Sequence, residues 1–227
     1  MTTAPTPDGA QPRGLLVDYG GVLTTNIFES FHAFERAEGL EKWTVGRLLR
    51  DDPRARPLLT ELEIGAVTDA EFETGMAALL GVEPKGLIKR LLGPARLEHA
   101  VVDAVRAIHA SGVPTALVSN SWGIDMYQRE LLDDLFDEIV ISGEVRMRKP
   151  NPEIYRIAAR RLGLEPSRCV FVDDLPANLE PARELGMTVV HHTDPADTAA
   201  ELARLFGLPS LPEQRVDGAS GAASVQA

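Results

Sequence analysis

The sequence contains little cysteine and few aromatic residues, and it has no long apolar run. A single cysteine among 227 residues, Cys169, excludes an internal disulfide and a multi-cysteine zinc site, and it suits a reducing compartment. Cys169 lies in the apolar run CVFV, which predicts a buried strand thiol rather than a nucleophile. No apolar run reaches the roughly 18 to 20 residues of a membrane span, and the first residues lack the pattern of a secretory signal. We therefore expect a soluble, cytoplasmic protein without a membrane partner.

Positive charge is also scarce in this chain. There are 23 Lys and Arg residues against 34 Asp and Glu residues, which gives a formal net charge of −11. Such a protein repels nucleic acid and anionic membranes, so we expect no nucleic-acid partner. A phosphate-bearing ligand would need a local, shielded positive site. The hydrophobic share of 44% and the charged share of 25% are typical of a globular protein.

Composition and periodicity divide the chain into distinct parts. Both ends have too few large apolar side chains to pack, so we expect them to be disordered tails. A long segment near the N-terminus has only helical patterns, including a capping box formed by Thr68 and Glu71, and it predicts an inserted helical cap. The expected parts are tails over residues 1–12 and 209–227, a core over 13–25 and 97–208, and a helical cap over 26–96.

Short, continuous, β-branched runs predict buried strands. The clearest runs are LLVDY (15–19), TALVSN (115–120), CVFVDD (169–174) and TVVHH (188–192), with EIVIS (138–142) as a weaker fifth. Continuous rather than alternating apolar residues are typical of strands that are covered on both faces. Amphipathic helical segments lie between the runs. This order predicts an α/β fold, a Rossmann-like doubly wound parallel sheet that carries the helical cap as an insertion.

Polar residues follow the predicted strands at their carboxyl ends, where ligands bind in doubly wound sheets. Asp18 ends the first run, Ser119 and Asn120 end the second, and Asp173 with Asp174 ends another. Lys149 precedes the helix that leads to this last strand. A strand-end Asp can simply cap a turn, and paired acids can form a solvated loop. Together, however, the three carboxylates, the hydroxyl and the ammonium suit phosphoryl transfer with a carboxylate nucleophile and a magnesium ion.

The strings that carry these residues resemble the four motifs of the haloacid dehalogenase superfamily. They are LLVDYGGVL, LVSNSW, RKPNPEIY and VFVDDLPANLEPARELGM, in that order along the chain. Within the superfamily, the last three are most similar to the group that resembles the N-terminal phosphatase domain of soluble epoxide hydrolase. The resemblance covers roughly residues 14–208. Four ordered motifs at the ends of predicted strands are a much more specific signal than one short pattern.

The resemblance implies a magnesium-dependent hydrolase, most simply a phosphatase of a small phosphorylated metabolite. Asp18 would be the nucleophile that becomes an aspartyl phosphate, and it would also bind magnesium. The carbonyl of Gly20 and the carboxylates of Asp173 and Asp174 would complete the magnesium site, directly or through water. The oligomeric state cannot be inferred from the sequence.

The same resemblance assigns the phosphate-binding residues. Ser119 and the backbone N–H of Asn120 would hold the phosphate, and Lys149 would neutralise both the nucleophile and the phosphate. Asn178 would orient the magnesium site, although a polar residue on a helix surface needs no such role. The adjacent His191 and His192 do not have metal-ligand spacing and are interpreted as structural.

Gly20 departs from the pattern of the family. Phosphatases of this superfamily carry a second Asp at this position, which protonates the leaving oxygen and then activates water. Such acid–base help is worth about a hundred- to ten-thousand-fold in rate. One interpretation is a phosphatase for good leaving groups, or one that takes an acid from the cap or from a water. Others are carbon–phosphorus or carbon–halogen cleavage, and a catalytically weak or inactive regulatory protein that binds a phosphorylated ligand.

Further residues bear on these alternatives. The paired Asp173 and Asp174 argue against a dehalogenase, which needs no magnesium. Weak candidates for the imine-forming lysine of carbon–phosphorus cleavage are Lys42, Lys85 and Lys89. Where relatives have small or apolar residues, this chain has Arg146 and Arg148, which would form either a solvated basic patch or an attraction for an anionic substrate.

Overall fold

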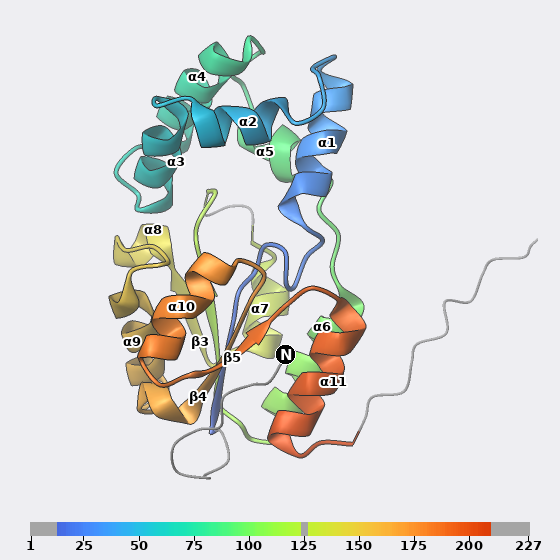
Figure 1. Cartoon of the computed structure of the whole chain (residues 1–227), viewed down its shortest axis with the longest axis vertical. Helices are drawn as coiled ribbons and strands as arrows, with labels where there is room; N and C mark the ends of the chain where they lie inside the picture. Colours follow the sequence, from blue (N-terminus) through green and yellow to red (C-terminus); the bar gives the residue numbers. More distant parts are fainter. Residues whose placement is uncertain (1–12, 124–126, 210–227) are drawn as a thin grey trace, which may run out of the picture.

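A parallel five-stranded sheet forms the centre of the protein. The computed structural model describes residues 13–123 and 127–209, so the expected tails lie outside the described residues, Pro209 excepted. The strands occur in the order β3-β2-β1-β4-β5, which confirms the predicted α/β fold (Figure 1). They are β1 (Gly14–Val17), β2 (Thr115–Ser119), β3 (Glu138–Ile141), β4 (Cys169–Asp173) and β5 (Thr188–His191).

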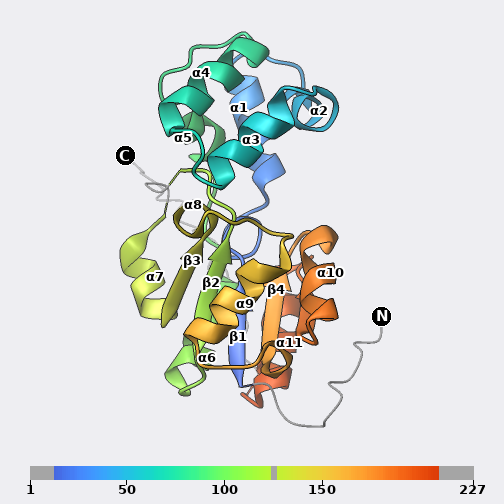
Figure 2. The same cartoon turned by 90° about the vertical axis from the view of Figure 1, so that its left-hand side faces the viewer.

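The three central strands are buried along their whole length, which explains their continuous apolar sequences. One face of the sheet packs against α6 (His99–Ala110), α7 (Arg129–Leu135) and α11 (Pro195–Phe206). The other face packs against α9 (Pro152–Arg161) and α10 (Pro176–Glu184), as Figure 2 shows. The connections contain the short helix α8 (Ser142–Val145) and a 3₁₀ turn (Pro166–Arg168). The weak fifth run of the sequence forms β3.

Helices α1 to α5 form a separate group, called here the helical layer. Its members are α1 (Ile27–Ala37), α2 (Thr44–Asp51), α3 (Ala55–Glu63), α4 (Asp69–Leu80) and α5 (Leu87–Leu92). The layer has its own apolar core around Phe34, Phe72 and Met76. It lies beyond the carboxyl ends of the strands (Figures 1 and 2). The chain enters and leaves it side by side, because Thr24 and Leu97 form an antiparallel bridge.

Local signals in the sequence correspond to the observed helix ends. Thr68 Oγ1 accepts a hydrogen bond from Glu71 N (3.3 Å), and the Glu71 carboxylate accepts one from Thr68 N (2.8 Å), so the predicted capping box is present. The side chain of Asn151 caps α9, and Pro152 occupies the first turn. Among the described helices, none is long and apolar enough to cross a membrane.

Candidate active site

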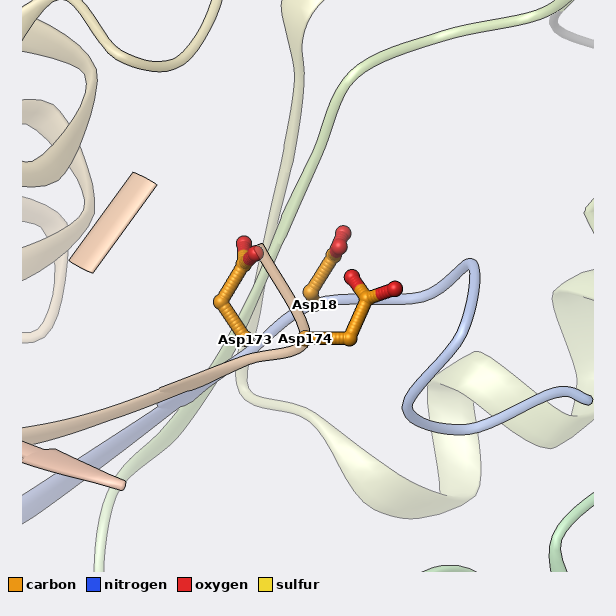
Figure 3. A group of neighbouring side chains, drawn as sticks. All are labelled: Asp18, Asp173 and Asp174. Carbon is orange, nitrogen blue, oxygen red and sulfur yellow. The ribbon is translucent and has the colours of Figure 1, made fainter. Parts of the chain in front are cut away.

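Three carboxylates meet at the carboxyl edge of the sheet. Asp18 follows β1 directly, Asp173 is the last residue of β4, and Asp174 comes next. The two strands are paired, with Val17 opposite Val172, so their carboxyl ends are adjacent. Each of the three side chains offers an oxygen atom, and these atoms lie within 4.8 Å of one another (Figure 3). The structure therefore brings together the three acids that the sequence singled out.

Lys149 lies between two of these carboxylates. Its Nζ atom is 2.7 Å from Asp18 Oδ1 and 2.7 Å from Asp173 Oδ2. The lysine side chain is only 1% exposed, so its ammonium has little access to water. A lysine enclosed in this way must be paired with acids to remain charged. Lys149 therefore neutralises the Asp18 carboxylate in the geometry expected of a fixed cation beside a nucleophile.

Asp173 is held in place by several donors. Asn178 Nδ2 lies 2.9 Å from Asp173 Oδ1 and 3.1 Å from Oδ2, and the backbone N–H of Leu175 donates to Oδ1 at 2.9 Å. With Lys149 on Oδ2, both carboxylate oxygens are engaged. Asn178 is buried in the first turns of α10, so it is not merely a polar residue on a helix surface. Its contacts orient Asp173.

The acidic cluster has too little positive charge around it. Burial, opposed by Lys149 and aided by Asp173, raises the pKa of Asp18 to about 8. Burial and the neighbouring Asp173 raise the pKa of Asp174 to about 6. Burial opposes the charge of Lys149, but the two carboxylates outweigh it and raise the pKa of Lys149 above its ordinary value. One ammonium does not compensate three carboxylates, and a divalent cation would supply the missing charge.

The donor set fits magnesium. All the available ligand atoms are oxygens, which a hard cation such as magnesium prefers. Among the described residues, none donates a hydrogen bond to Asp18 Oδ2, because Lys149 and the Tyr19 N–H (2.7 Å) both contact Oδ1. The Asp174 carboxylate likewise has no side-chain donor in the described part of the chain. These two acids are free to bind an ion, whereas Asp173 is already engaged.

Gly21 has a structural role that the sequence did not reveal. Its φ of +83° is in the left-handed region, which a side chain rarely adopts. A Cβ atom at Gly21 would lie 2.6 Å from Asp174 Oδ2 and would displace that carboxylate. At Gly20, by contrast, a Cβ atom would meet no other atom within 4 Å. Glycine is therefore required at residue 21, whereas residue 20 has room for a side chain.

The expected phosphate-binding residues lie at the end of β2. Ser119 is buried, and its Oγ accepts a hydrogen bond from the Tyr127 hydroxyl at 2.9 Å. The Asn120 side chain accepts from Lys149 N (2.8 Å) and donates to Lys149 O (3.1 Å). Asn120 thus fixes the backbone of Lys149, a role beyond the backbone N–H contact that the resemblance implied. Tyr127 was not predicted, because it follows β2 at a distance where no local pattern points back to Ser119.

Arg148 pairs with the helical layer. Its Nε atom lies 2.5 Å from Glu63 Oε2 at the end of α3, and the Glu63 side chain is 5% exposed. Burial raises the pKa of Glu63 to about 7 although Arg148 opposes this shift. The solvated basic patch expected of Arg146 and Arg148 is therefore wrong for Arg148, because a buried acid of another layer takes up its charge. Arg146 is exposed.

We expect Arg148→Met to destabilise the protein. The substitution leaves the Glu63 carboxylate buried without its partner, which costs about 1–3 kcal/mol of unfolding free energy. Urea unfolding would measure this loss. The double variant Arg148→Met with Glu63→Leu should regain part of the lost unfolding free energy, because it contains no unpaired buried acid. A single variant as stable as wild type would show that the ion pair does not hold the helical layer to the core.

The remaining candidates do not contribute side chains to the acidic cluster. Lys42, Lys85 and Lys89 are all exposed on the helical layer, and none of them lines the cavity beside the cluster. His191 Nε2 lies 3.1 Å from the backbone O of Asp174, and the buried His192 Nδ1 lies 2.8 Å from Thr198 Oγ1. Both histidines make structural contacts.

Known proteins with similar sequences include a bifunctional epoxide hydrolase 2 and a phosphatase. The epoxide hydrolase, from Rattus norvegicus, is 32% identical over 118 residues, which are 49% of this chain and 21% of that protein. The chain thus spans about a fifth of the length of that relative. A sesquiterpene phosphatase of Aspergillus oryzae is 30% identical over 132 residues, 57% of this chain and 67% of that protein.

A solved structure and a family model agree on the assignment. A HAD family enzyme of Bacteroides thetaiotaomicron, crystallised with magnesium and inorganic phosphate, has a TM-score of 0.62 over 80% of this chain and 94% of its own. At 22% identity this likeness concerns the fold. The family model of haloacid dehalogenase-like hydrolases matches residues 12–186, which is most of the chain. The chain therefore belongs to the haloacid dehalogenase-like hydrolases.

Proposed function

We propose that this hydrolase is a magnesium-dependent phosphatase that acts on a small phosphorylated metabolite through an aspartyl phosphate at Asp18. One observation carries the proposal. Asp18 lies at the centre of an enclosed site, 2.7 Å from a buried ammonium and within 4.8 Å of two further acids. The phosphatase among the sequence relatives supports the reaction class, and the structural neighbour with magnesium and phosphate supports the cofactor.

Magnesium would be held by the carboxylates of Asp18 and Asp174 and by the carbonyl of Gly20. Asp173 would act on the ion through water, because Lys149, Asn178 and the Leu175 N–H already engage its oxygens. When bound, magnesium neutralises charge on the phosphate and the acids and polarises the phosphorus. Gly21 allows this arrangement because it leaves room for the Asp174 carboxylate.

The protein's own groups would bind the phosphate before reaction. Ser119 Oγ accepts a hydrogen bond from the Tyr127 hydroxyl, so its own O–H remains free to donate to a phosphate oxygen. The Asn120 backbone N–H and the Lys149 ammonium supply two further donors. These groups are fixed in advance, because Asn120 anchors the backbone of Lys149 on both sides of the peptide. Preorganised donors of this kind stabilise the charge that develops on the transferred phosphoryl group.

The reaction would proceed in two displacements. The Asp18 carboxylate attacks phosphorus, a phosphorus–oxygen bond forms, and the bond to the leaving oxygen breaks. The leaving group departs with the electron pair. A water molecule then attacks the same phosphorus, the bond to Asp18 breaks, and inorganic phosphate leaves while the carboxylate is restored. Without an acid at residue 20, the first displacement favours leaving groups that depart without a proton.

A phosphatase assay with a metal series tests the proposal. Purified protein should hydrolyse activated phosphate esters such as phenyl phosphate when magnesium is present, and EDTA should stop the reaction. A protein that binds magnesium and beryllium trifluoride, which mimics an aspartyl phosphate, without turning over any ester would be a phosphate-binding regulator instead. Such a protein would keep its biological effect when Asp18 is replaced.

We expect magnesium to stabilise the protein, and to stabilise it more at high pH. Metal-free Asp174 and Asp18 have raised pKa values of about 6 and about 8, so the folded protein retains these protons more tightly than the unfolded chain. This contribution to stability is present at low pH and is lost as the pH rises through those values. Magnesium replaces the protons. At a concentration of about 100 times Kd it should raise Tm by about 5–10 °C near pH 8 and by less near pH 5.5.

Thermal melts at both pH values, with and without magnesium, measure this effect. Asp174→Asn is the matched control, because it removes one ligand oxygen charge without changing the shape of the side chain. It should lose most of the magnesium-dependent gain. Equal gains at the two pH values, or an Asp174→Asn protein that responds as wild type does, would contradict the assignment of the ligands.

A further inference from the structure

A cavity of about 210 Å³ opens beside the site, between the core and the helical layer. Three of the residues that line it are Gly20, Ser119 and Asn120, so it begins where the phosphate would bind. Sites that enclose drug-sized ligands have volumes of about 300–1,000 Å³. This cavity is smaller, and its shared lining with the phosphate site makes it the space open to the leaving group of an ester.

The walls of the cavity combine apolar and polar side chains, with apolar surface predominating. Ile27, Leu92 and Leu97 contribute aliphatic surface, and Trp122 contributes an aromatic ring. Trp122 is fixed by the helical layer, since its ring lies 5.7 Å from that of Phe31 and 6.0 Å from that of Phe72. Among the described residues that line the cavity, none is Asp, Glu, Lys, Arg or His. A negatively charged tail on the ligand would lose its hydration there without gaining an ion-pair partner from these residues.

One polar group in the wall has no partner. Ser30 of α1 lines the cavity and is 1% exposed, and its Oγ makes no hydrogen bond within the described part of the chain. Buried hydroxyls are normally hydrogen-bonded, and those that are not call for an explanation such as a ligand. A ligand with one donor or acceptor on its apolar body would satisfy this hydroxyl.

We infer that the substrates are phosphate monoesters whose leaving group is small, uncharged and mostly apolar, with a single hydrogen-bonding group that reaches Ser30. This inference rests on the proposed function and narrows it to a substrate class. The hydroxyls of Thr24, Thr25 and Tyr127 also line the cavity but already make hydrogen bonds, so a polyol phosphate would leave several of its hydroxyls unpaired. Phosphorylated carboxylic acids and diphosphates would place a second negative charge against a wall in which no described residue is a cation.

Three aryl phosphates test the inference: phenyl phosphate, 4-carboxyphenyl phosphate and 4-(hydroxymethyl)phenyl phosphate. The three phenol leaving groups are similar in acidity. The carboxylate slightly favours departure of its phenolate, so this electronic effect alone would give the carboxyphenyl ester the higher kcat/KM, opposite to the order that we expect. Binding is measured with magnesium in Asp18→Asn, which cannot turn the esters over, and kcat/KM is measured in wild type. Phenyl phosphate should bind about tenfold or more tightly than the carboxyphenyl ester. The hydroxymethyl ester should bind about three- to tenfold more tightly than phenyl phosphate.

Two variants separate the contributions to this preference. Ser30→Ala removes the hydroxyl that the hydroxymethyl group would contact. In this variant the hydroxymethyl and phenyl esters should therefore bind with nearly equal affinity. Leu92→Lys places a cation in the wall of the cavity. It should raise the affinity for the carboxyphenyl ester by about tenfold relative to the affinity for phenyl phosphate. A carboxyphenyl ester that binds as tightly as phenyl phosphate in the starting protein, or ratios that neither variant changes, would overturn the inference. If no ester is hydrolysed but the order of binding holds, the proposed phosphatase function fails while the ligand class stands.

Discussion

Replacing Asp18 by Asn should abolish phosphatase turnover, lowering kcat by about ten-thousand-fold or more, the scale on which loss of a covalent nucleophile acts. An amide cannot form the acyl phosphate, and it donates a proton where the carboxylate only accepts. The fold should survive the change. Asn has nearly the shape of Asp, and the Lys149 ammonium keeps its second partner, Asp173 Oδ2 at 2.7 Å. Loss of activity would then report chemistry rather than unfolding.

The measurements for this prediction are kcat with phenyl phosphate and trapping of the phosphorylated protein by acid quench. Wild type should carry one acid-stable phosphoryl group during turnover, and Asp18→Asn should carry none. The matched control is Asp173→Asn, which keeps the nucleophile but removes one charged partner of Lys149. It should slow turnover while leaving the phosphoryl group detectable. Wild-type kcat in Asp18→Asn would exclude the aspartyl phosphate.

The location of the site was predictable from the sequence because parallel strands end at one edge of their sheet. The runs ending in Asp18, Ser119 and Asp173 are all buried strands, and their pairing places these residues together. The helical layer was predictable as an all-helical segment, since it contains no apolar β-branched run. Local chemistry at helix starts, such as the cap by Asn151, was equally readable.

The contacts that hold the site could not be read in this way. The Asn120 side chain bonds the backbone of Lys149 across 29 residues, and Glu63 meets Arg148 from another layer of the protein. Neither pairing leaves a periodic pattern in the sequence, because each joins residues that are far apart in the chain and meet only through the tertiary fold. The orientation of Tyr127 toward Ser119 has the same origin. Local patterns predict which residues reach the sheet edge, and tertiary packing decides what each one touches.

Introducing the missing acid with Gly20→Asp should accelerate the hydrolysis of simple alkyl phosphates by about a hundred- to ten-thousand-fold and change activated aryl or acyl phosphates much less. A leaving alkoxide needs a proton, whereas an activated group departs without one. The structure has room for the side chain, since a Cβ atom at Gly20 meets nothing within 4 Å. Gly20 also lines the cavity beside the phosphate site, where the leaving oxygen would emerge.

The measurement is the dependence of kcat/KM on leaving-group pKa, which should be steep in the natural protein and flatter in Gly20→Asp, because a positioned acid offsets the basicity of the leaving oxygen. Gly21→Asp is the matched control. It adds the same charge one residue away, but its φ of +83° and the 2.6 Å approach to Asp174 Oδ2 mean that it should disrupt magnesium binding and lower every rate. A shallow dependence in the natural protein, with no gain in Gly20→Asp, would mean that another group already supplies the proton. The Tyr127 hydroxyl, 2.9 Å from Ser119 Oγ, would then be the first candidate for that proton donor, and Tyr127→Phe would test it.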